Sequence, residues 1–170
     1  MASVVSPSST PADPETGTGD LSVSLVVASS QEEVALHHRI RRAVFVDEQG
    51  MFEETDVDGR DEDPATLKVL GFCGSVAAGA VRLYPLDEAG LWKGDRLAVL
   101  PPYRPRGLGA PLVRFAVRTA GERGGHLMVA HIQPRNVGFF RRLGWHVVGE
   151  PKIFVGREHQ KMAIRLDAEA

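Results

Sequence analysis

The run of residues best suited to binding an anion is Arg104-Pro105-Arg106-Gly107-Leu108-Gly109-Ala110. Glycine tolerates the backbone angles of a tight turn, so several main-chain N–H groups of such a turn can converge on one anion. A helical spacing of apolar residues starts at Leu108, and the start of a helix adds the positive end of its dipole. Five arginines and a single acid, Glu122, lie between positions 104 and 123. The segment therefore predicts a site for a phosphate or pyrophosphate.

Three known phosphate-binding motifs compete for this segment. A P-loop is excluded because no Gly-Lys-Ser or Gly-Lys-Thr follows, and a dinucleotide-binding fingerprint is excluded because the third glycine is missing. The remaining pattern is Gln/Arg-x-x-Gly-x-Gly/Ala, which Arg104, Gly107 and Gly109 satisfy. An ordinary turn that binds no ligand fits the same residues when this motif is taken alone.

A second motif makes a family resemblance specific. The first pattern resembles the pyrophosphate loop of the GNAT family of N-acetyltransferases, and NVGFFRRLGW at positions 136–145 resembles that family's Asn-x-Ala/Gly-x-x-Phe/Tyr-x-x-Leu-Gly-Phe/Trp. FVDEQ at 45–49 and GREHQKM at 156–162 are similar to stretches found in some branches. The resemblance covers about residues 21–166. Together with RLYPLDEAGLWKGDRLAV and HIQPRNVGFFRRLGW, the ending also resembles the nitrogen-starvation-type branch.

The resemblance implies a fold, a cosubstrate and a reaction. The fold would be α/β (α+β), with a mixed, mostly antiparallel sheet splayed into a V and flanked by helices. Acetyl-CoA would donate an acetyl group directly to the amine of a small molecule, and the main-chain N–H of Val99 would stabilise the oxyanion. The implied CoA-binding residues are Leu97, Ala98, Val99, Arg104, Arg106, Gly107, Leu108, Gly109, Ala110, Asn136 and Phe139.

The catalytic residues are harder to assign. The family commonly places a tyrosine on the last helix to protonate the leaving thiolate, but the matching position holds Phe140, which cannot donate a proton. Glu48, His131 and His159 are the candidates for acid–base work or for anchoring the amine. Each has a structural alternative: a solvated helix end for Glu48 and a packed, hydrogen-bonded ring for each histidine.

The departure at Phe140 leaves several outcomes open. The thiolate could leave without help, the protein could bind CoA as a regulator without turnover, or the acyl group could be other than acetyl. Cys73 is the only cysteine and is expected to be a bystander, since direct transfer needs no covalent intermediate. Arg135, Arg141 and Arg142 are expected to be solvated, with the 3′-phosphate of CoA as the alternative ligand.

Hydrophobic periodicity predicts the elements that position these residues. Residues 21–28, 66–72, 76–84, 96–100, 127–132, 145–148 and 159–166 are expected to be strands. Helices are expected from the glutamates after Ser29 and Ser30 to about Gly50, over 108–123, and from Asn136 to Gly144. The acidic run at 53–63 is expected to be a solvated loop, with attraction of a cationic amine as its functional alternative.

Composition limits the remaining possibilities. The net charge of −2 gives no general argument for nucleic acid, and no apolar run reaches the length of a membrane helix. A lone cysteine rules out an internal disulfide and suggests the cytoplasm. The six histidines show no zinc-like spacing, so no metal is expected. Residues 1–20 are expected to be a disordered tail before one domain at 21–170, and a homodimer is common in the family.

Overall fold

The computed structural model describes residues 22–154 and 156–166, so the predicted tail at 1–20 lies outside the described residues. The chain divides into two compact units. The first contains residues up to Asp56, Lys68–Ala80 and Leu97–Leu112, and the second contains Val57–Leu67, Val81–Arg96 and the residues from Val113. Within the described part of the chain, no helix is long and apolar enough to cross a membrane.

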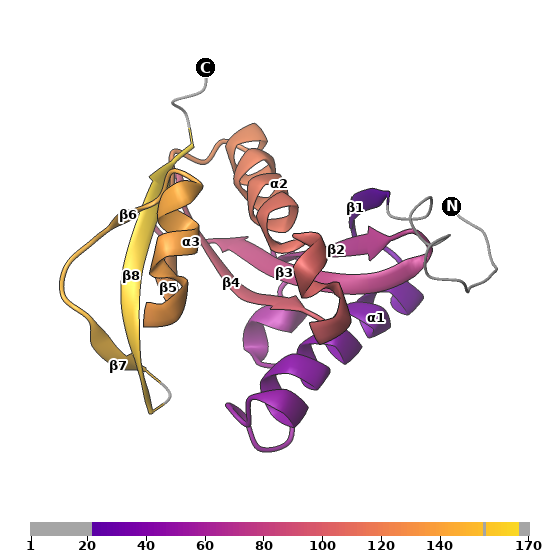
Figure 1. The fold of residues 1–170 in the computed structure, drawn as a ribbon. Helices are drawn as coiled ribbons and strands as arrows, with labels where there is room; N and C mark the ends of the chain where they lie inside the picture. The colour runs from indigo at the N-terminus through magenta and orange to yellow at the C-terminus, as the bar shows by residue number, and fades with distance from the viewer. Residues whose placement is uncertain (1–21, 155, 167–170) are drawn as a thin grey trace. The chain divides into compact units, whose positions relative to one another are not determined.

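The strands pair in the order β1-β2-β3-β4-β5-β8-β6, with β7 on β8 (Figure 1). Pairing is parallel between β4 and β5 and antiparallel in β1–β2, β5–β8, β6–β8 and β7–β8. The predicted α/β fold with a mixed, mostly antiparallel sheet is therefore confirmed. The strands are β1 (Val23–Val27), β2 (Leu67–Cys73), β3 (Val76–Pro85), β4 (Leu91–Val99), β5 (Leu127–Ile132), β6 (His146–Val147), β7 (Lys152–Phe154) and β8 (Arg157–Arg165).

The first helix of the chain begins as predicted but changes its winding. Helix α1 (Gln31–Arg41) starts at Ser30, whose hydroxyl accepts a hydrogen bond from the main-chain N–H of Glu33 at 3.0 Å. The Glu33 carboxylate accepts in return from the main chain of Ser30, which completes a capping box. The chain then continues as a π-helix over Arg42–Glu48, a winding found often at functional sites.

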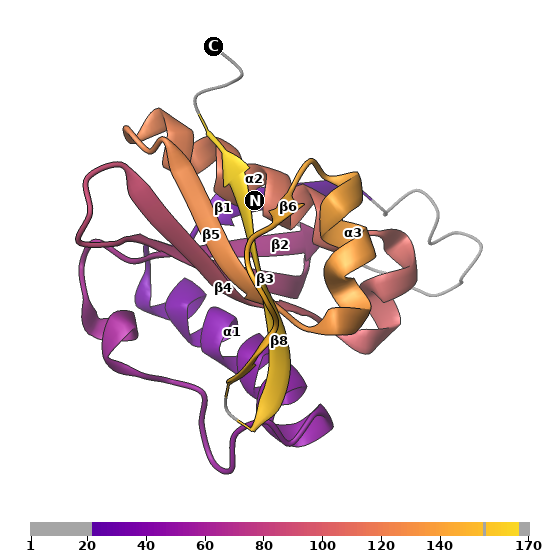
Figure 2. The same ribbon diagram turned by 90° about the vertical axis from the view of Figure 1, so that its left-hand side faces the viewer.

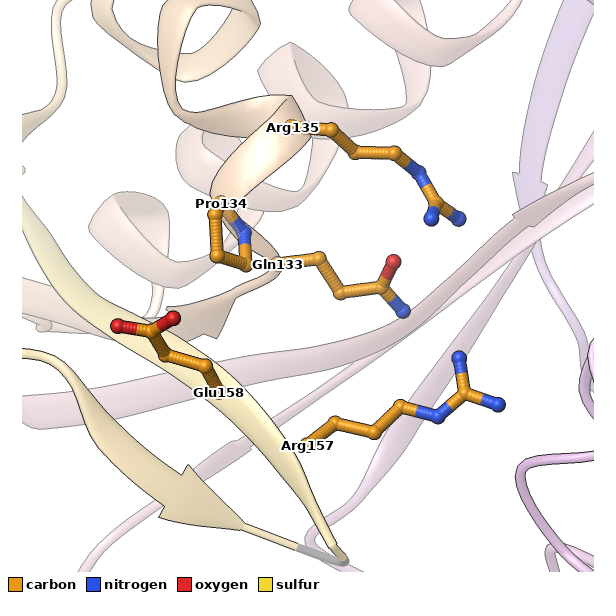
Figure 3. Close-up of a pocket in the computed structure, with 5 residues that line it drawn as sticks. All are labelled: Gln133, Pro134, Arg135, Arg157 and Glu158. Carbon is orange, nitrogen blue, oxygen red and sulfur yellow. The ribbon is translucent and has the colours of Figure 1, made fainter.

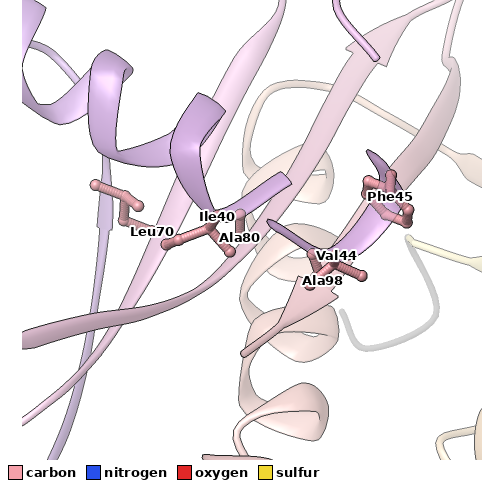
Figure 4. Close-up of a cluster of buried hydrophobic side chains, with 6 residues drawn as sticks. All are labelled: Ile40, Val44, Phe45, Leu70, Ala80 and Ala98. Carbon is pink, nitrogen blue, oxygen red and sulfur yellow. The ribbon is translucent and has the colours of Figure 1, made fainter. Parts of the chain in front are cut away.

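The core of the first unit lies beneath this helical segment (Figure 4). Ile40, Val44 and Phe45 form one cluster with Leu70 of β2, and the small side chains of Ala80 and Ala98 complete it. All six side chains are at most 8% exposed. Burial of such apolar side chains is worth about 1.5–3 kcal/mol for each large one. The end of the π-helix, which carries Glu48, is therefore held by the packing of Val44 and Phe45.

In the second unit the last helix packs through aromatic rings. Helix α3 (Val137–Arg142) lies beside β6 and β8 (Figure 2). The ring of Phe140 meets those of Phe139 and Trp145 edge to face, at centroid distances of 5.2 and 5.3 Å. A Cβ on Gly144, just after α3, would lie 3.6 Å from the side chain of Ile164. The face of β8 that carries Ile164 is therefore covered by the end of α3. Phe140 is thus a packing residue in this structure.

The expectation of a solvated acidic loop at 53–63 is wrong for Asp56 and Asp61, whereas the side chain of Asp58 is 44% exposed. In the first unit, Asp56 is 2% exposed and its carboxylate accepts from Arg41 Nε at 2.8 Å. In the second unit, Asp58 and Asp61 accept from Nη1 of Arg82 at 2.7 and 3.0 Å. A buried guanidinium requires compensating partners, because an unpaired charge in the interior is very unfavourable.

Arg82 is the centre of this cluster in the second unit. The residue is fully buried and also donates from Nε and Nη2 to the two oxygens of Asp95, each at 2.8 Å. Tyr84 donates its hydroxyl to Asp95 at 3.3 Å, and burial together with the Asp95 charge raises the pKa of Tyr84 to about 12. A short 3₁₀-helix, Gly59–Glu62, holds Asp61 in place.

The cluster makes stability depend on pH in acid. Desolvation alone would raise the pKa of Asp58, but the hydrogen bond and charge of Arg82 outweigh it and lower the pKa. A carboxyl with a lowered folded-state pKa stabilises the fold above its unfolded pKa, which is about 3.9. That contribution is lost as the pH falls through the lowered value.

One predicted strand boundary is wrong and one strand was missed, because both depend on contacts with other strands. The strand predicted at 96–100 starts earlier than expected: β4 begins at Leu91 and buries Trp92 and Gly94. A Cβ on Gly94 would lie 3.5 Å from the sulfur of Met128, so the glycine permits close packing of β4 against the Met128 side chain. Strand β7 was not predicted, because it is formed only by pairing with β8.

Replacing one partner of the buried arginine tests the cluster. Asp61→Ala is expected to lower the free energy of unfolding by about 2 kcal/mol, because it removes a charge-assisted hydrogen bond from a buried guanidinium. Glu62→Ala, an exposed neighbour in the same short helix, should change it by less than about 0.5 kcal/mol. Urea denaturation at pH 7 measures both, and equal stability of the two variants would contradict the role given to Asp61.

Candidate functional site

The predicted anion-binding loop adopts the tight turn that its glycines suggest. A 3₁₀-helix over Pro101–Arg106 ends at Gly107, which has φ of 74° and donates its N–H to the carbonyl of Arg104 at 3.0 Å. Helix α2 (Gly109–Glu122) begins two residues later. A Cβ on Gly107 would meet no atom within 4 Å, so the outer side of the turn is open. Such a turn at a helix start presents main-chain N–H groups outward.

The loop is fixed in the first unit by one buried side chain. Leu108 is fully buried. Its methyl groups would lie only 2.9 Å from a Cβ added to Gly79 and 3.3 Å from a Cβ added to Gly71. Leu112 occupies the same glycine-lined surface one helical turn on. Leu108 can therefore offer a ligand only its main chain, while its side chain determines how closely the turn approaches the sheet.

Arg104 and Glu48 are brought together although 56 residues separate them. Nη1 and Nη2 of Arg104 donate to the two carboxylate oxygens of Glu48 at 2.8 and 2.6 Å. Nε of the same guanidinium donates to the carbonyl of Val99 at 2.9 Å. Hydrogen bonds to Glu48 raise the pKa of Arg104. The arginine of the motif thus braces the end of β4 against the π-helix.

The other predicted CoA residues occupy positions consistent with main-chain or surface roles. Arg106 is exposed beside the ring of Tyr103, 5.8 Å from its centroid, and Ala110 lies in the first turn of α2. In the second unit, exposed Asn136 ends the 3₁₀-helix Pro134–Asn136, and α3 follows at Val137. The predicted members at the end of β4 are Leu97, Ala98 and Val99, and the one on α3 is Phe139.

In the second unit, β4 and β5 are joined over only a short length. The parallel pairing connects Leu91–Lys93 with Leu127–Val129. Three residues further on, Arg96 has φ of 55°, an uncommon value for a residue other than glycine and typical of a bulge. The remaining part of β5 pairs with β8. The parallel register between these two strands thus runs from Leu91 to Lys93 of β4.

Both candidate histidines lie on one face of the β5–β8 pair. In the antiparallel register His131 is opposite Lys161 and Ile132 is opposite Gln160. Residues directly opposite share a face and alternate residues return to it, so Lys161 and His159 lie on the face of His131. His131 is exposed, whereas His159 is 7% exposed.

The two rings differ in their electrostatics. Desolvation and then the positive charges of Lys93 and Lys161 lower the pKa of His131, which favours the neutral ring that can accept a proton. His159 Nδ1 lies 3.1 Å from the carbonyl of Arg157. A carbonyl only accepts, so Nδ1 carries the proton in that contact and Nε2 of the neutral ring is the accepting nitrogen.

Two other expectations from the sequence reasoning concern cysteine and metal chemistry. The predicted bystander Cys73 is 4% exposed, and burial raises the pKa of its thiol despite the nearby charge of Arg106. A nucleophilic cysteine requires a lowered pKa. Within the residues that the structure describes, no group of three or more His, Cys, Asp or Glu side chains is arranged to hold a metal ion.

A cleft that sequence reasoning missed lies in the second unit, with a volume of about 310 Å³ (Figure 3). It is lined by Gln133, Pro134, Arg135, Arg157 and Glu158. Of these residues, only Arg135 was singled out from the sequence, as a solvated residue with the 3′-phosphate of CoA as the alternative ligand. The sequence does show that Gln133 shares a strand face with His131 and that Arg157 shares one with His159. That these two faces are the same one follows only from the register of β5 against β8, which the sequence does not contain.

Comparisons with known proteins give a family match and several relatives. The chain matches the family model described as "Acetyltransferase (GNAT) family" over residues 33–145. It is similar to an uncharacterized N-acetyltransferase of Bacillus subtilis (strain 168), with 25% identity over 138 residues that span 81% of this chain and 96% of the relative. It is also similar to streptothricin acetyltransferase of Streptomyces lavendulae, with 33% identity over 109 residues that span 62% of this chain and 57% of the relative.

Solved structures share the fold. An acyl-CoA N-acyltransferase from Pseudomonas aeruginosa superposes with a TM-score of 0.75 at 21% identity, over 84% of this chain and 99% of that one. Escherichia coli ElaA gives a TM-score of 0.75 at 21% identity, over 84% and 99%. The nitrogen-starvation-type branch stays a prediction.

The electrostatic account of His131 is directly measurable. Lys161→Gln should raise the pKa of His131, because it removes a positive charge that disfavours the imidazolium. Lys152→Gln makes the same change of charge at an exposed position of β7 and should leave that pKa unchanged. Imidazole NMR shifts followed against pH give both values, and identical titration curves in the two variants would contradict the assignment.

Proposed function

The chain belongs to the acetyltransferase (GNAT) family, and from this premise we propose that it transfers an acetyl group directly from acetyl-CoA to the amine of a small molecule. It is an acyltransferase, and members of the family use an acyl-CoA and an acceptor. The proposal concerns which acyl group moves, which class of acceptor receives it and which residues act. Among its relatives, one is named as an acetyltransferase of streptothricin, which supports an acetyl donor and a small-molecule acceptor.

The observation that carries the proposal is the open turn at Gly107. Its positive φ orients the turn, no atom lies within 4 Å of its missing Cβ, and α2 begins directly after it. In the proposed complex, main-chain N–H groups of Gly107 to Ala110 bind the pyrophosphate of CoA. Arg104 contributes by holding Val99 and Glu48 in place, as its three hydrogen bonds indicate.

The end of β4 is proposed to bind the pantetheine arm. Its amides would pair with the main chain of Leu97 to Val99, and the N–H of Val99 would face the thioester carbonyl. An N–H already in position stabilises the oxyanion without reorganisation when the amine attacks. Arg104 fixes the carbonyl of Val99 at 2.9 Å, so the end of this strand is held in a defined orientation.

His131 is our proposed acceptor of the amine proton, with His159 and Glu48 as the alternatives. A lowered pKa keeps the His131 ring neutral, and its exposure leaves it accessible to an acceptor. Glu48 is less suited to this role, because both of its carboxylate oxygens already accept hydrogen bonds from Arg104. Phe140 is buried against Trp145, so the thiolate is proposed to leave without a tyrosine donor, which a thiol of pKa about 8.5 permits.

A matched pair of glycine substitutions tests the loop. Gly107 and Gly149 have φ of 74° and 73°, and a Cβ added at either would meet no atom within 4 Å. Alanine at either position should therefore cost a similar amount of stability, about 1–2 kcal/mol. Only Gly107→Ala is expected to weaken CoA binding, by about tenfold or more, because the methyl group enters the space proposed for the pyrophosphate. Calorimetry with CoA measures the affinities, and equal affinity in both variants would refute the loop assignment.

Turnover assays test the assignment of the base. Release of free thiol from acetyl-CoA is followed with a panel of small amines, and His131→Gln should lower kcat by about 100-fold or more with little change in CoA affinity. His146→Gln, an exposed histidine on β6, is the control and should retain full activity. A comparable loss in His159→Gln or Glu48→Gln alone would move the role to that residue.

Glu48→Gln is informative because its exposed pair with Arg104 contributes only about 0–1 kcal/mol to stability. A large loss of kcat in that variant could not be attributed to unfolding. CoA binding without thiol release from any amine would instead identify a CoA-responsive regulator, and faster release from longer acyl-CoAs would identify a different acyl group.

A further inference from the structure

The cleft at the end of β5 gathers donors from two segments of the second unit. Gln133 directly follows β5, Arg135 lies in the 3₁₀-helix Pro134–Asn136, and Arg157 is the first residue of β8. This 3₁₀-helix contacts β8. Figure 3 shows the side chains of Gln133, Arg135 and Arg157 extending to the same side, with the amide of Gln133 between the two guanidinium groups.

The side chains that meet there are suited to a planar anion. A guanidinium presents a rigid fork of N–H donors that matches a carboxylate, and the Gln133 amide adds two more donors. Glu158 also lines the cleft, but its carboxylate is directed away from the guanidinium groups (Figure 3). Among the side chains that line the cleft, the three donors therefore face it and the one carboxylate does not.

The surrounding charge is positive. Residues 127–165 contain seven arginines and lysines and only two acids, Glu150 and Glu158. On the same face, the charges of Lys93 and Lys161 contribute to the lowered pKa of His131. A field that disfavours a positive imidazolium favours an anion, so geometry and electrostatics indicate the same kind of ligand.

The cleft also adjoins the histidines by register. Gln133 has extended φ and ψ of −63° and 141°, and it lies two residues beyond His131. Arg157 lies two residues before His159, so alternation places these four residues on one face. Two residues of a strand span about 7 Å, a separation that a small molecule can bridge with an amine at one end and an anion at the other.

We propose that Gln133, Arg135 and Arg157 bind the carboxylate of the acceptor, which makes the substrate class a small molecule bearing both an amine and a carboxylate. This inference rests on the proposed N-acetyltransferase activity and adds the acceptor class to it. The amine lies toward His131, the carboxylate lies in the cleft, and no covalent step beyond the proposed transfer is required. The phosphate of a nucleotide is the other source of an anion for such donors, and a separate arm of the experiment distinguishes it.

Paired acceptors that differ in one charge test the subsite. Thiol release is measured with glycine, β-alanine and 4-aminobutyrate, each against its primary amide, with rates corrected for the fraction of free amine. Wild-type protein should prefer at least one acid over its amide by about tenfold or more. The preference should fall toward unity in Arg135→Gln and Arg157→Gln, with KM for the acid rising. It should persist in Arg141→Gln, which removes the same charge from an exposed position on α3.

The possible outcomes distinguish failure of the carboxylate subsite from failure of the proposed transferase function. Turnover of amines without any preference for the acid, or a preference unaffected by both cleft variants, would overturn the subsite and leave the transferase function intact. Absence of thiol release with every amine would overturn the function, and the acceptor subsite with it. In the second arm, calorimetry compares CoA with CoA lacking its 3′-phosphate. If Arg135→Gln and Arg157→Gln abolish the advantage of the phosphate, the cleft binds the nucleotide and the acceptor assignment is wrong.

Discussion

The burial of Leu108 against two glycines is the contact on which the arrangement of the first unit depends. Gly71 and Gly79 lack the side chains that would otherwise occupy the positions of the Leu108 and Leu112 methyl groups. Because the leucine is fully buried, the turn that carries Gly107 is held close to β2 and β3. An anion-binding loop requires main-chain N–H groups in a fixed orientation, and this apolar contact supplies that rigidity without using any polar group of the loop.

The charged side chains reinforce each unit from within. Arg41 with Asp56 in the first unit and Arg82 with Asp58, Asp61 and Asp95 in the second anchor a segment whose composition suggests a solvated loop. Such buried pairs are poor evidence of net stabilisation, because desolvation offsets much of the attraction. The pairs instead disfavour other conformations of the loop, because a conformation that removes the carboxylates from Arg82 would leave a buried charge without compensation. Asp56 and Asp61 of the acidic run are thus tied to buried arginines, whereas Glu53, Glu54, Glu62 and Asp63 remain exposed.

The strands of the second unit carry packing residues on one face and the candidate histidines on the other. One face of β8 is covered near Ile164 and Gly144, where the aromatic residues of α3 pack. The other carries His131, Lys161 and His159, and it continues into the cleft of Gln133 and Arg157. The period of two along a strand produces this division, so the covered face lies toward α3 and the polar groups gather on the opposite face.

What the sequence by itself determined were the features governed by local backbone physics. The capping box at Ser30, the turn at Gly107, the boundaries of β5 and the family motifs all follow from residues close together in the chain. Only the tertiary structure decided that Arg104 binds Glu48 across 56 residues, that Arg82 gathers three aspartates and that Gln133 and Arg157 share a cleft. These contacts depend on strand register and on which charges become buried, and burial in turn decides whether a charged residue must find a partner or remains in water. No local pattern encodes that choice, because it is made by residues far away in the chain.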